Sequence, residues 1–186
     1  NECWLESDAR LRTDFNVQTG VKLDGIDAFK EKSEMKRYYA KGGIRTARQI
    51  KASEGLEAVK RFSKDAGYPL FAKPDVGVGA GGAHKLEDET QIEDFFQNTP
   101  DFANYVIEEF VTGNICTYDA IINSKGEPLA ESMCVFPPTI ADIVNQNLDC
   151  TYYVERHMSE NLRFSGPTTV VAFGVKSRFI HLEFFR

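Results

Sequence analysis

The stretch from Phe71 to Lys85, FAKPDVGVGAGGAHK, combines residue types that could hold a phosphate group. Lys73 stands just before glycines 77, 79 and 82, which fit the spacing G-x-G-x-x-G. A lysine on a strand presents a compact positive charge, and glycines let backbone N–H groups approach phosphate oxygens without hindrance from a Cβ atom. The same stretch is also typical of a flexible surface turn with an exposed lysine. The loop alone leaves both interpretations open.

The residues on either side of the glycines exclude two common phosphate-binding motifs. A dinucleotide fingerprint needs a helix directly after the glycine turn, whereas the segment AHKL at 83–86 reads as a strand. A Walker A loop ends in G-K-[ST], and this loop ends in G-A-H. A protein-kinase lid has the right order of strand, loop and strand, but its lysine lies on a later strand. The order found here, a strand with a lysine, a glycine loop, a strand and a helix, still favours a phosphate clamp.

The last strand-like run, RFIHLEFF at 178–185, places a carboxylate where it could bind a metal ion. In a strand, Glu183 and His181 would lie on one face together with two phenylalanines. A carboxylate buried among aromatic side chains needs a partner, because an unpaired buried charge is costly. Magnesium shared with the phosphate oxygens of a ligand is one suitable partner for Glu183, and a structural arginine or lysine is the other. His181 is expected to support such a site or to pack beside it.

These residues are carried by helices and strands that do not strictly alternate. Apolar spacing and glycine or proline stops predict helices at 2–15, 26–41, 53–67, 87–98 and 159–175. Strand-like runs occupy 68–74, 83–86, 105–111, 115–123, 128–136, 150–155 and 178–185. Ser53 is expected to cap the third helix, and Gly166-Pro167 to shape or interrupt the last one. The turn NSKG at 123–126 is a hairpin signal with Gly126 available for positive φ, so antiparallel sheet and the α+β class are favoured.

Composition and charge limit the kinds of partner. The chain has 186 residues, 42% of them hydrophobic, and a formal net charge of −6. A nucleic-acid surface needs a basic face, so we expect no nucleic-acid partner. No run is long and apolar enough to span a bilayer, and the opening NECWLESDAR lacks the order of a signal peptide. The four cysteines show neither C-x-x-C nor zinc spacing; Cys116 and Cys134 are expected to be small core residues, in a reduced, cytoplasmic protein.

Four segments, in order along the chain, resemble the ATP-grasp superfamily, in particular its biotin carboxylase and carbamoyl-phosphate synthetase branch. They are EKSEMKRYYAKGGI, GYPLFAKPDVGVGAGGAHKL, YVIEEFVTGNICTYDAIIN and FIHLEFF. The resemblance covers residues 26–186 and implies a partial ATP-grasp fold, with mostly antiparallel sheets, flanking helices and a small central lid. It also implies three parts: a helical segment at 1–52 with the lysine helix, a lid at 53–112 with the glycine loop, and a truncated C-terminal sheet at 113–186.

By this resemblance, ATP phosphates are contacted from two sides by Lys32 and Lys73. The glycines expected to fold over these phosphates are Gly77, Gly79, Gly81 and Gly82. Lys36, one helical turn after Lys32, competes for the first role, although such a lysine is commonly solvated. Lys32 is preferred because its distance from Gly43 matches the family better.

The resemblance also assigns the adenine, ribose and metal contacts. Backbone groups around Glu108, Glu109 and Val111 would read the adenine edge; the alternative is an edge strand whose acids face water. The family often has a ribose-binding acid where this chain has an isoleucine, so Asp119 is the substitute candidate. Glu183 would bind Mg²⁺.

The activity implied is that of an ATP-dependent carbon–nitrogen ligase or carboxylase, similar to carbamoyl-phosphate synthetase. ATP would activate a carboxylate or bicarbonate as an acyl-phosphate, with Mg²⁺ neutralising the transferred phosphate. The family normally supplies a second metal carboxylate, an asparagine and an arginine shortly after the strand that carries Glu183. They are not in this sequence, so the fragment alone is expected to be inactive and to need the rest of a larger chain. The alternative is a nucleotide-binding or assembly module without catalysis.

Overall fold

Two antiparallel four-stranded sheets organise the chain. The computed structural model describes residues 4–77, 82–137, 143 and 146–186. The first sheet has the order β1-β4-β2-β3, with bounds β1 (Gln49–Lys51), β2 (Leu70–Pro74), β3 (His84–Leu86) and β4 (Tyr105–Glu109). The second has the order β7-β6-β5-β8, with bounds β5 (Ile115–Ile122), β6 (Pro128–Phe136), β7 (Tyr153–Val154) and β8 (Arg178–Phe185). The predicted α+β class is confirmed.

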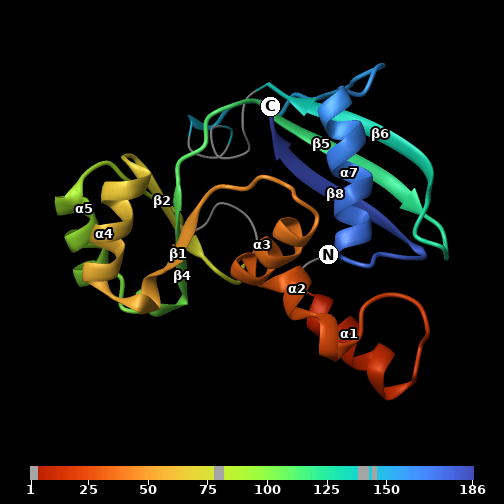
Figure 1. Ribbon diagram of the computed structural model, residues 1–186, viewed down its shortest axis with the longest axis horizontal. Coiled ribbons are helices and arrows are strands. Elements are labelled where there is room, and N and C mark those ends of the chain that lie inside the picture. The colour runs from red at the N-terminus through yellow and green to blue at the C-terminus, as the bar shows by residue number, and fades with distance from the viewer. Residues whose placement is uncertain (1–3, 78–81, 138–142, 144–145) are drawn as a thin grey trace.

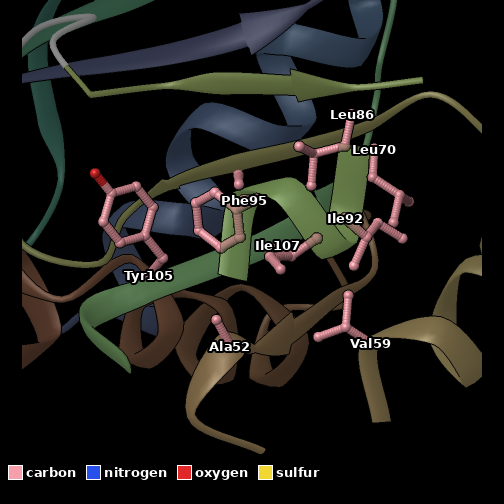
Figure 2. Packing of buried hydrophobic residues seen from close by; sticks show 9 residues of the cluster. Ala52, Val59, Leu70, Leu86, Ile92, Phe95, Tyr105 and Ile107 are labelled. Atoms are coloured by element: carbon pink, nitrogen blue, oxygen red, sulfur yellow. The ribbon is translucent and has the colours of Figure 1, made fainter. Parts of the chain in front are cut away.

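One face of the first sheet is covered by helices α4 (Leu56–Ala66) and α5 (Glu89–Asn98). Alternate residues of β2 and β4 point into this core, where Leu70 and Ile107 are fully buried with Val59 and Ile92 from the helices (Figure 2). The Asp88 carboxylate caps α5 by accepting the amide of Gln91 at 2.9 Å, which satisfies a helix-end donor. The opposite face carries Lys73 and Glu108 together with the apolar Phe71 and Val106.

The second sheet is covered on one face by α7 (Glu160–Ala172), which crosses its strands in Figure 1. Tyr118 of β5 is fully buried beneath this helix. The fit depends on Gly166, because a Cβ atom there would lie 2.5 Å from the Tyr118 ring. The β5–β6 hairpin turns at 123–126 with Gly126 at φ 89°, as predicted.

The N-terminal segment supplies helices α1 (Leu5–Asp14), α2 (Asp27–Lys30) and α3 (Lys32–Lys41). In Figure 1, α3 lies between the two sheets. The single helix predicted at 26–41 is wrong, because Glu31 is extended and the helix restarts at Lys32. The cause is Asp75, whose carboxylate accepts the amide of Ser33 at 2.8 Å and its hydroxyl at 2.6 Å. A carboxylate at a helix N-terminus satisfies free amides and favours a new start there.

Two other local expectations differ from the structure, and one strand was not predicted. Ser53 does not cap α4: residues 52–54 form a 3₁₀ turn, and the helix begins after Gly55, whose φ is 94°. Pro167 lies inside α7, and the helix continues through it. The short strand β1 carries no pattern that predicted it; it pairs with β4 and thereby places β4 in the interior of the first sheet.

Candidate nucleotide-binding site

The carboxylate of Glu108 lies between two ammonium groups. Its Oε1 is 2.7 Å from Lys36 Nζ, and its Oε2 is 2.7 Å from Lys73 Nζ. The Glu108 side chain is 8% exposed, that of Lys36 16% and that of Lys73 27%. Three elements, α3, β4 and β2, therefore converge on one charge cluster. The alternative that Lys36 is an ordinary solvated lysine is wrong.

Strand alternation explains why Lys73 and Glu108 share a face. In the β2–β4 ladder, Phe71 is opposite Glu108 and Lys73 is opposite Val106. Ala72, which lies between Phe71 and Lys73 on β2, points into the helix-covered core. Side chains one residue away therefore point to the other face, and the diagonal pair Lys73–Glu108 meets there under α3.

Lys32 lies at the entrance to the glycine loop. Its Nζ donates to the carbonyl oxygens of Gly77 at 3.2 Å and Asp75 at 3.4 Å, and its backbone amide donates to Asp75 O at 3.0 Å. Lys32 and Lys36 are four residues apart on α3, so both predicted candidates lie on the helix face turned toward the first sheet. The structure thus brings Lys32, Lys36 and Lys73 to the side of the first sheet that faces α3.

The two ends of the glycine loop that the structure describes have positive φ angles, 149° at Gly77 and 76° at Gly82. A Cβ atom at Gly82 would lie 3.1 Å from the Tyr105 hydroxyl, so a larger residue would crowd the loop. These are backbone conformations that glycine adopts without strain. The predicted ligands Gly79 and Gly81 lie outside the described residues.

The segment from Glu108 to Val111 leaves the first sheet and leads to β5. The backbone amide of Glu109 donates to Arg48 O at 3.1 Å, and its carboxylate accepts from Arg48 Nε at 2.7 Å. That hydrogen bond holds the pKa of Glu109 below its usual value. The alternative of an edge strand with acids facing water is wrong, because β4 lies between β1 and β2. The roles of Glu108, Glu109 and Val111 toward adenine stay predictions.

The face of the second sheet opposite α7 carries a second polar cluster. Asp119 of β5 is opposite His181 of β8, and their Oδ1 and Nδ1 atoms are 2.6 Å apart. His181 Nε2 is 3.6 Å from Glu183 Oε1. The Thr117 hydroxyl, opposite Glu183, donates to Asp119 Oδ2 at 2.5 Å. Asp119 thus groups with Glu183.

The environment of Glu183 differs from the expectation. Its side chain is 59% exposed, so it is not buried among aromatics, and Phe179 and Phe185 on the same face are also exposed. Within the part of the chain that the structure describes, its carboxylate pairs with His181 and not with an arginine or lysine. The carboxylate is therefore accessible to a ligand.

Cys116 is buried in the core as predicted, whereas Cys134 is half-buried on the other face of the second sheet.

Helix α3 connects the two clusters. Burial is the main cause that raises the pKa of Tyr39, and the negative charge of Glu183 raises it further. Tyr39 therefore lies within electrostatic reach of Glu183, and its ring packs on Phe173 beside α7 at 5.1 Å between centroids. Lys36 is less than one helical turn before Tyr39. One helix thus carries a lysine of the first cluster and a tyrosine that senses the charge of Glu183.

Comparison with solved structures identifies this arrangement. An L-amino acid ligase from Bacillus licheniformis superposes with a TM-score of 0.73 at 16% identity, over 100% of this chain and 43% of the ligase. A biotin carboxylase from Campylobacter jejuni, in a complex with beta-gamma-ATP, gives a TM-score of 0.68 at 17% identity, over 96% of this chain and 42% of the carboxylase. These matches are ATP-grasp proteins. The chain has the ATP-grasp fold.

Sequence comparison alone is less informative. No protein-family profile matches the chain. Pyruvate carboxylase from Bacillus subtilis (strain 168) is 29% identical over 85 residues, which are 44% of this chain and 7% of that enzyme. The chain therefore spans less than half the length of these ATP-grasp structures and a small part of the carboxylase.

The donor atoms on the second sheet of this ATP-grasp fold suit magnesium in part. Glu183 and Asp119 offer carboxylate oxygens, which this hard cation prefers, and Mg²⁺ commonly takes one or two carboxylates together with phosphate oxygens. The described residues contain no group of three or more His, Cys, Asp or Glu that could hold a metal ion alone. Phosphate oxygens would have to complete the coordination.

Sequence reasoning missed Asp75 and Arg48. Asp75 directly follows Pro74, so the sequence places it at the end of a predicted strand. Its partner Ser33 is 42 residues away along the chain and carries no local signal of the contact. Arg48 is 61 residues from Glu109 and carries no local signal.

The described helices include none that is both long and apolar enough to cross a membrane.

Proposed function

We propose that this chain is the nucleotide-clamping part of an ATP-dependent ligase that activates a carboxylate or bicarbonate as an acyl-phosphate. The observation that carries the proposal is the cluster of Lys36, Lys73 and Glu108, in which Lys73 lies on the strand that leads into the glycine loop. Two ammonium groups share one carboxylate, so the largely buried cluster has a surplus positive charge. An anion supplied by a ligand would balance it, and ATP offers several phosphate oxygens.

The second cluster supplies the metal side of the proposal. Glu183 would bind Mg²⁺ together with ATP phosphates, and Asp119 and His181 would orient its carboxylate. Magnesium would neutralise charge on the phosphate being transferred. Transfer of a phosphoryl group depends mainly on positioning and charge neutralisation, which lysines and a metal-binding carboxylate provide.

The finer assignment is a ligase similar to carbamoyl-phosphate synthetase. It rests on the resemblance of the four segments, while the similar solved proteins include both a biotin carboxylase and an amino acid ligase. We infer a cytoplasmic setting, since Cys116, Cys134 and Cys150 are free thiols, as is usual in a reducing compartment. The rest of a longer chain would be the natural partner.

Calorimetric titration of the chain with Mg-ATP tests the nucleotide site. We expect saturable binding that Lys73→Ala weakens by roughly 1.5–3 kcal/mol, the range for a hydrogen bond to a charged group. Lys64→Ala is the matched control, because Lys64 is exposed on α4, behind the first sheet. Equal losses in both variants would contradict the assignment of Lys73.

Catalysis needs a separate measurement. ADP release should be followed with a panel of carboxylates and with bicarbonate, on the longest natural chain that contains this sequence. We expect release that depends on one substrate and on Mg²⁺. Tight Mg-ATP binding without release for any substrate would instead favour the non-catalytic nucleotide-binding module.

A further inference from the structure

We propose that Lys36 is a positioning residue: through the buried carboxylate of Glu108, it sets the place and the available charge of Lys73. This inference rests on the proposed function, because its effect is a change in the affinity of the chain for a nucleotide. Lys36 itself would not contact the phosphates.

The geometry makes Glu108 the connection between the two lysines. Each ammonium group is 2.7 Å from a different oxygen of the same carboxylate. With both oxygens engaged, the carboxylate cannot turn toward either lysine without losing the other. Glu108 is held by β4, an interior strand, so the position of this bridge is determined by the sheet.

Lys36 is directed into the protein, whereas Lys73 is the more accessible member of the cluster. Lys36 Nζ also donates to the backbone carbonyl of Ala47, so both its partners are protein groups. Its side chain is 16% exposed, against 27% for Lys73. An arriving phosphate would therefore meet Lys73 first.

The charge of Lys36 depends on the same bridge. Burial lowers the pKa of Lys36, and the charge and hydrogen bond of Glu108 oppose this effect. With Lys36 charged, its ammonium group neutralises Glu108 and leaves the charge of Lys73 for a ligand. Without Lys36, Lys73 and Glu108 would form a closed pair with no net charge, and both carboxylate oxygens would compete with phosphate for the same ammonium group.

A purely structural role is the competing explanation, in which Lys36 only attaches α3 to the first sheet. Such a role would affect every ligand and the stability of the fold alike. A role in positioning Lys73 would instead affect ligands with phosphates and spare adenosine, which has none. The two explanations therefore differ in the binding of Mg-ATP relative to adenosine.

The test compares three variants on one helix. Lys36→Gln removes the charge but can still donate to Glu108, Lys36→Arg keeps the charge, and Arg37→Gln is the matched control. Arg37 is the next residue, is 70% exposed and pairs only with Glu34 among the described residues. Affinities for Mg-ATP and adenosine are measured by calorimetry. Circular dichroism and thermal unfolding check that each variant is folded. If Lys36→Gln is unfolded, Lys36→Met replaces it with the same expectations.

We expect Lys36→Gln to weaken Mg-ATP binding about tenfold or more relative to Arg37→Gln, since breaking a buried charge pair has a larger effect than losing an exposed one. Adenosine binding should stay unchanged, and Lys36→Arg should restore most of the affinity for Mg-ATP. Equal binding of Mg-ATP by Lys36→Gln and Arg37→Gln overturns the inference, and so does a parallel loss of adenosine binding.

A double variant separates positioning from direct contact. In a chain that already carries Lys73→Met, Lys36→Gln should cost far less Mg-ATP affinity than it does alone, because the group it positions is gone. Independent, multiplying losses would mean that Lys36 contacts phosphate itself, and would overturn the positioning role. If the unaltered chain binds no Mg-ATP, the proposed function fails together with this inference; if it binds Mg-ATP and only the Lys36 expectations fail, the proposed function stands.

Discussion

At the scale of single residues, the ion pairs around the candidate site differ in how strongly water screens them. The Lys36–Glu108–Lys73 cluster is largely buried, so its charges interact strongly and each depends on the others. The Arg48–Glu109 pair is more open, with the Arg48 side chain 54% exposed and that of Glu109 25% exposed. Its contribution to stability should accordingly be modest.

The Glu109 pair predicts a specific dependence of stability on pH. The hydrogen bond from Arg48 lowers the pKa of Glu109 below the ordinary value of 4.5. The stabilisation is therefore fully present above about pH 4.5 and is lost as the pH falls through the lower, folded-state pKa. Glu109→Gln should lower the unfolding free energy by about 0.5–1 kcal/mol near pH 7, and by much less near pH 3.5.

Urea unfolding at the two pH values measures this difference. Glu57→Gln is a suitable control, because Glu57 is exposed on α4 and forms no ion pair with another described residue. A Glu109→Gln deficit that is the same at both pH values would show that the effect is not the ion pair with Arg48.

At the scale of elements, contact between α7 and β5 holds the second sheet and its polar face in place. Gly166 is buried where the helix meets the Tyr118 ring, and a Cβ atom would approach that ring to 2.5 Å. Gly166→Ala raises helix propensity by about 1 kcal/mol, but overpacking a core typically costs 1–3 kcal/mol, as a rough range. We expect a net loss of stability, since Tyr118 is fully enclosed and has no room to move.

Thermal and urea unfolding of Gly166→Ala would measure this loss. Asn161→Ala, an exposed change on the same helix, should be neutral or slightly stabilising. If Gly166→Ala stabilises the chain as Asn161→Ala does, the close approach of α7 to Tyr118 is not a constraint in solution.

At the scale of the whole molecule, the candidate nucleotide site is made by both sheets together with α3. Lys73 and Glu108 belong to the first sheet, Asp119 and Glu183 to the second, and Lys36 and Tyr39 of α3 connect them. Each sheet has its own hydrophobic core, so packing alone couples them weakly. A ligand that contacts both sheets would stabilise their arrangement relative to each other.

Mg-ATP should therefore raise the unfolding temperature of the chain. At a concentration one hundred times the dissociation constant, a ligand that binds only the folded state adds about 2.7 kcal/mol. Mg-GTP should raise the temperature less at equal concentration, because the backbone around Glu108 to Val111 is expected to read the adenine edge. Differential scanning calorimetry measures both, and equal shifts for the two nucleotides would contradict the adenine assignment.

The sequence by itself predicted most of the helices and strands, and it named most residues of the candidate site. β6 and β8 have the bounds predicted for them, because strand alternation and turn residues are local properties. The same alternation placed His181 and Glu183 on one face, and the order of four segments predicted the ATP-grasp fold.

Only the tertiary structure decided which charges meet and which faces are open. The position of Lys36 in its helix fits both a ligand-contacting and a solvated lysine, and its ion pair with Glu108 of β4 exists only in the folded chain. The start of α3 at Lys32 depends on Asp75, and the exposure of Glu183 depends on which face of the second sheet α7 covers. The physical reason is the same in each case: ion pairs, helix caps and burial depend on groups distant in the chain, and no local pattern contains them.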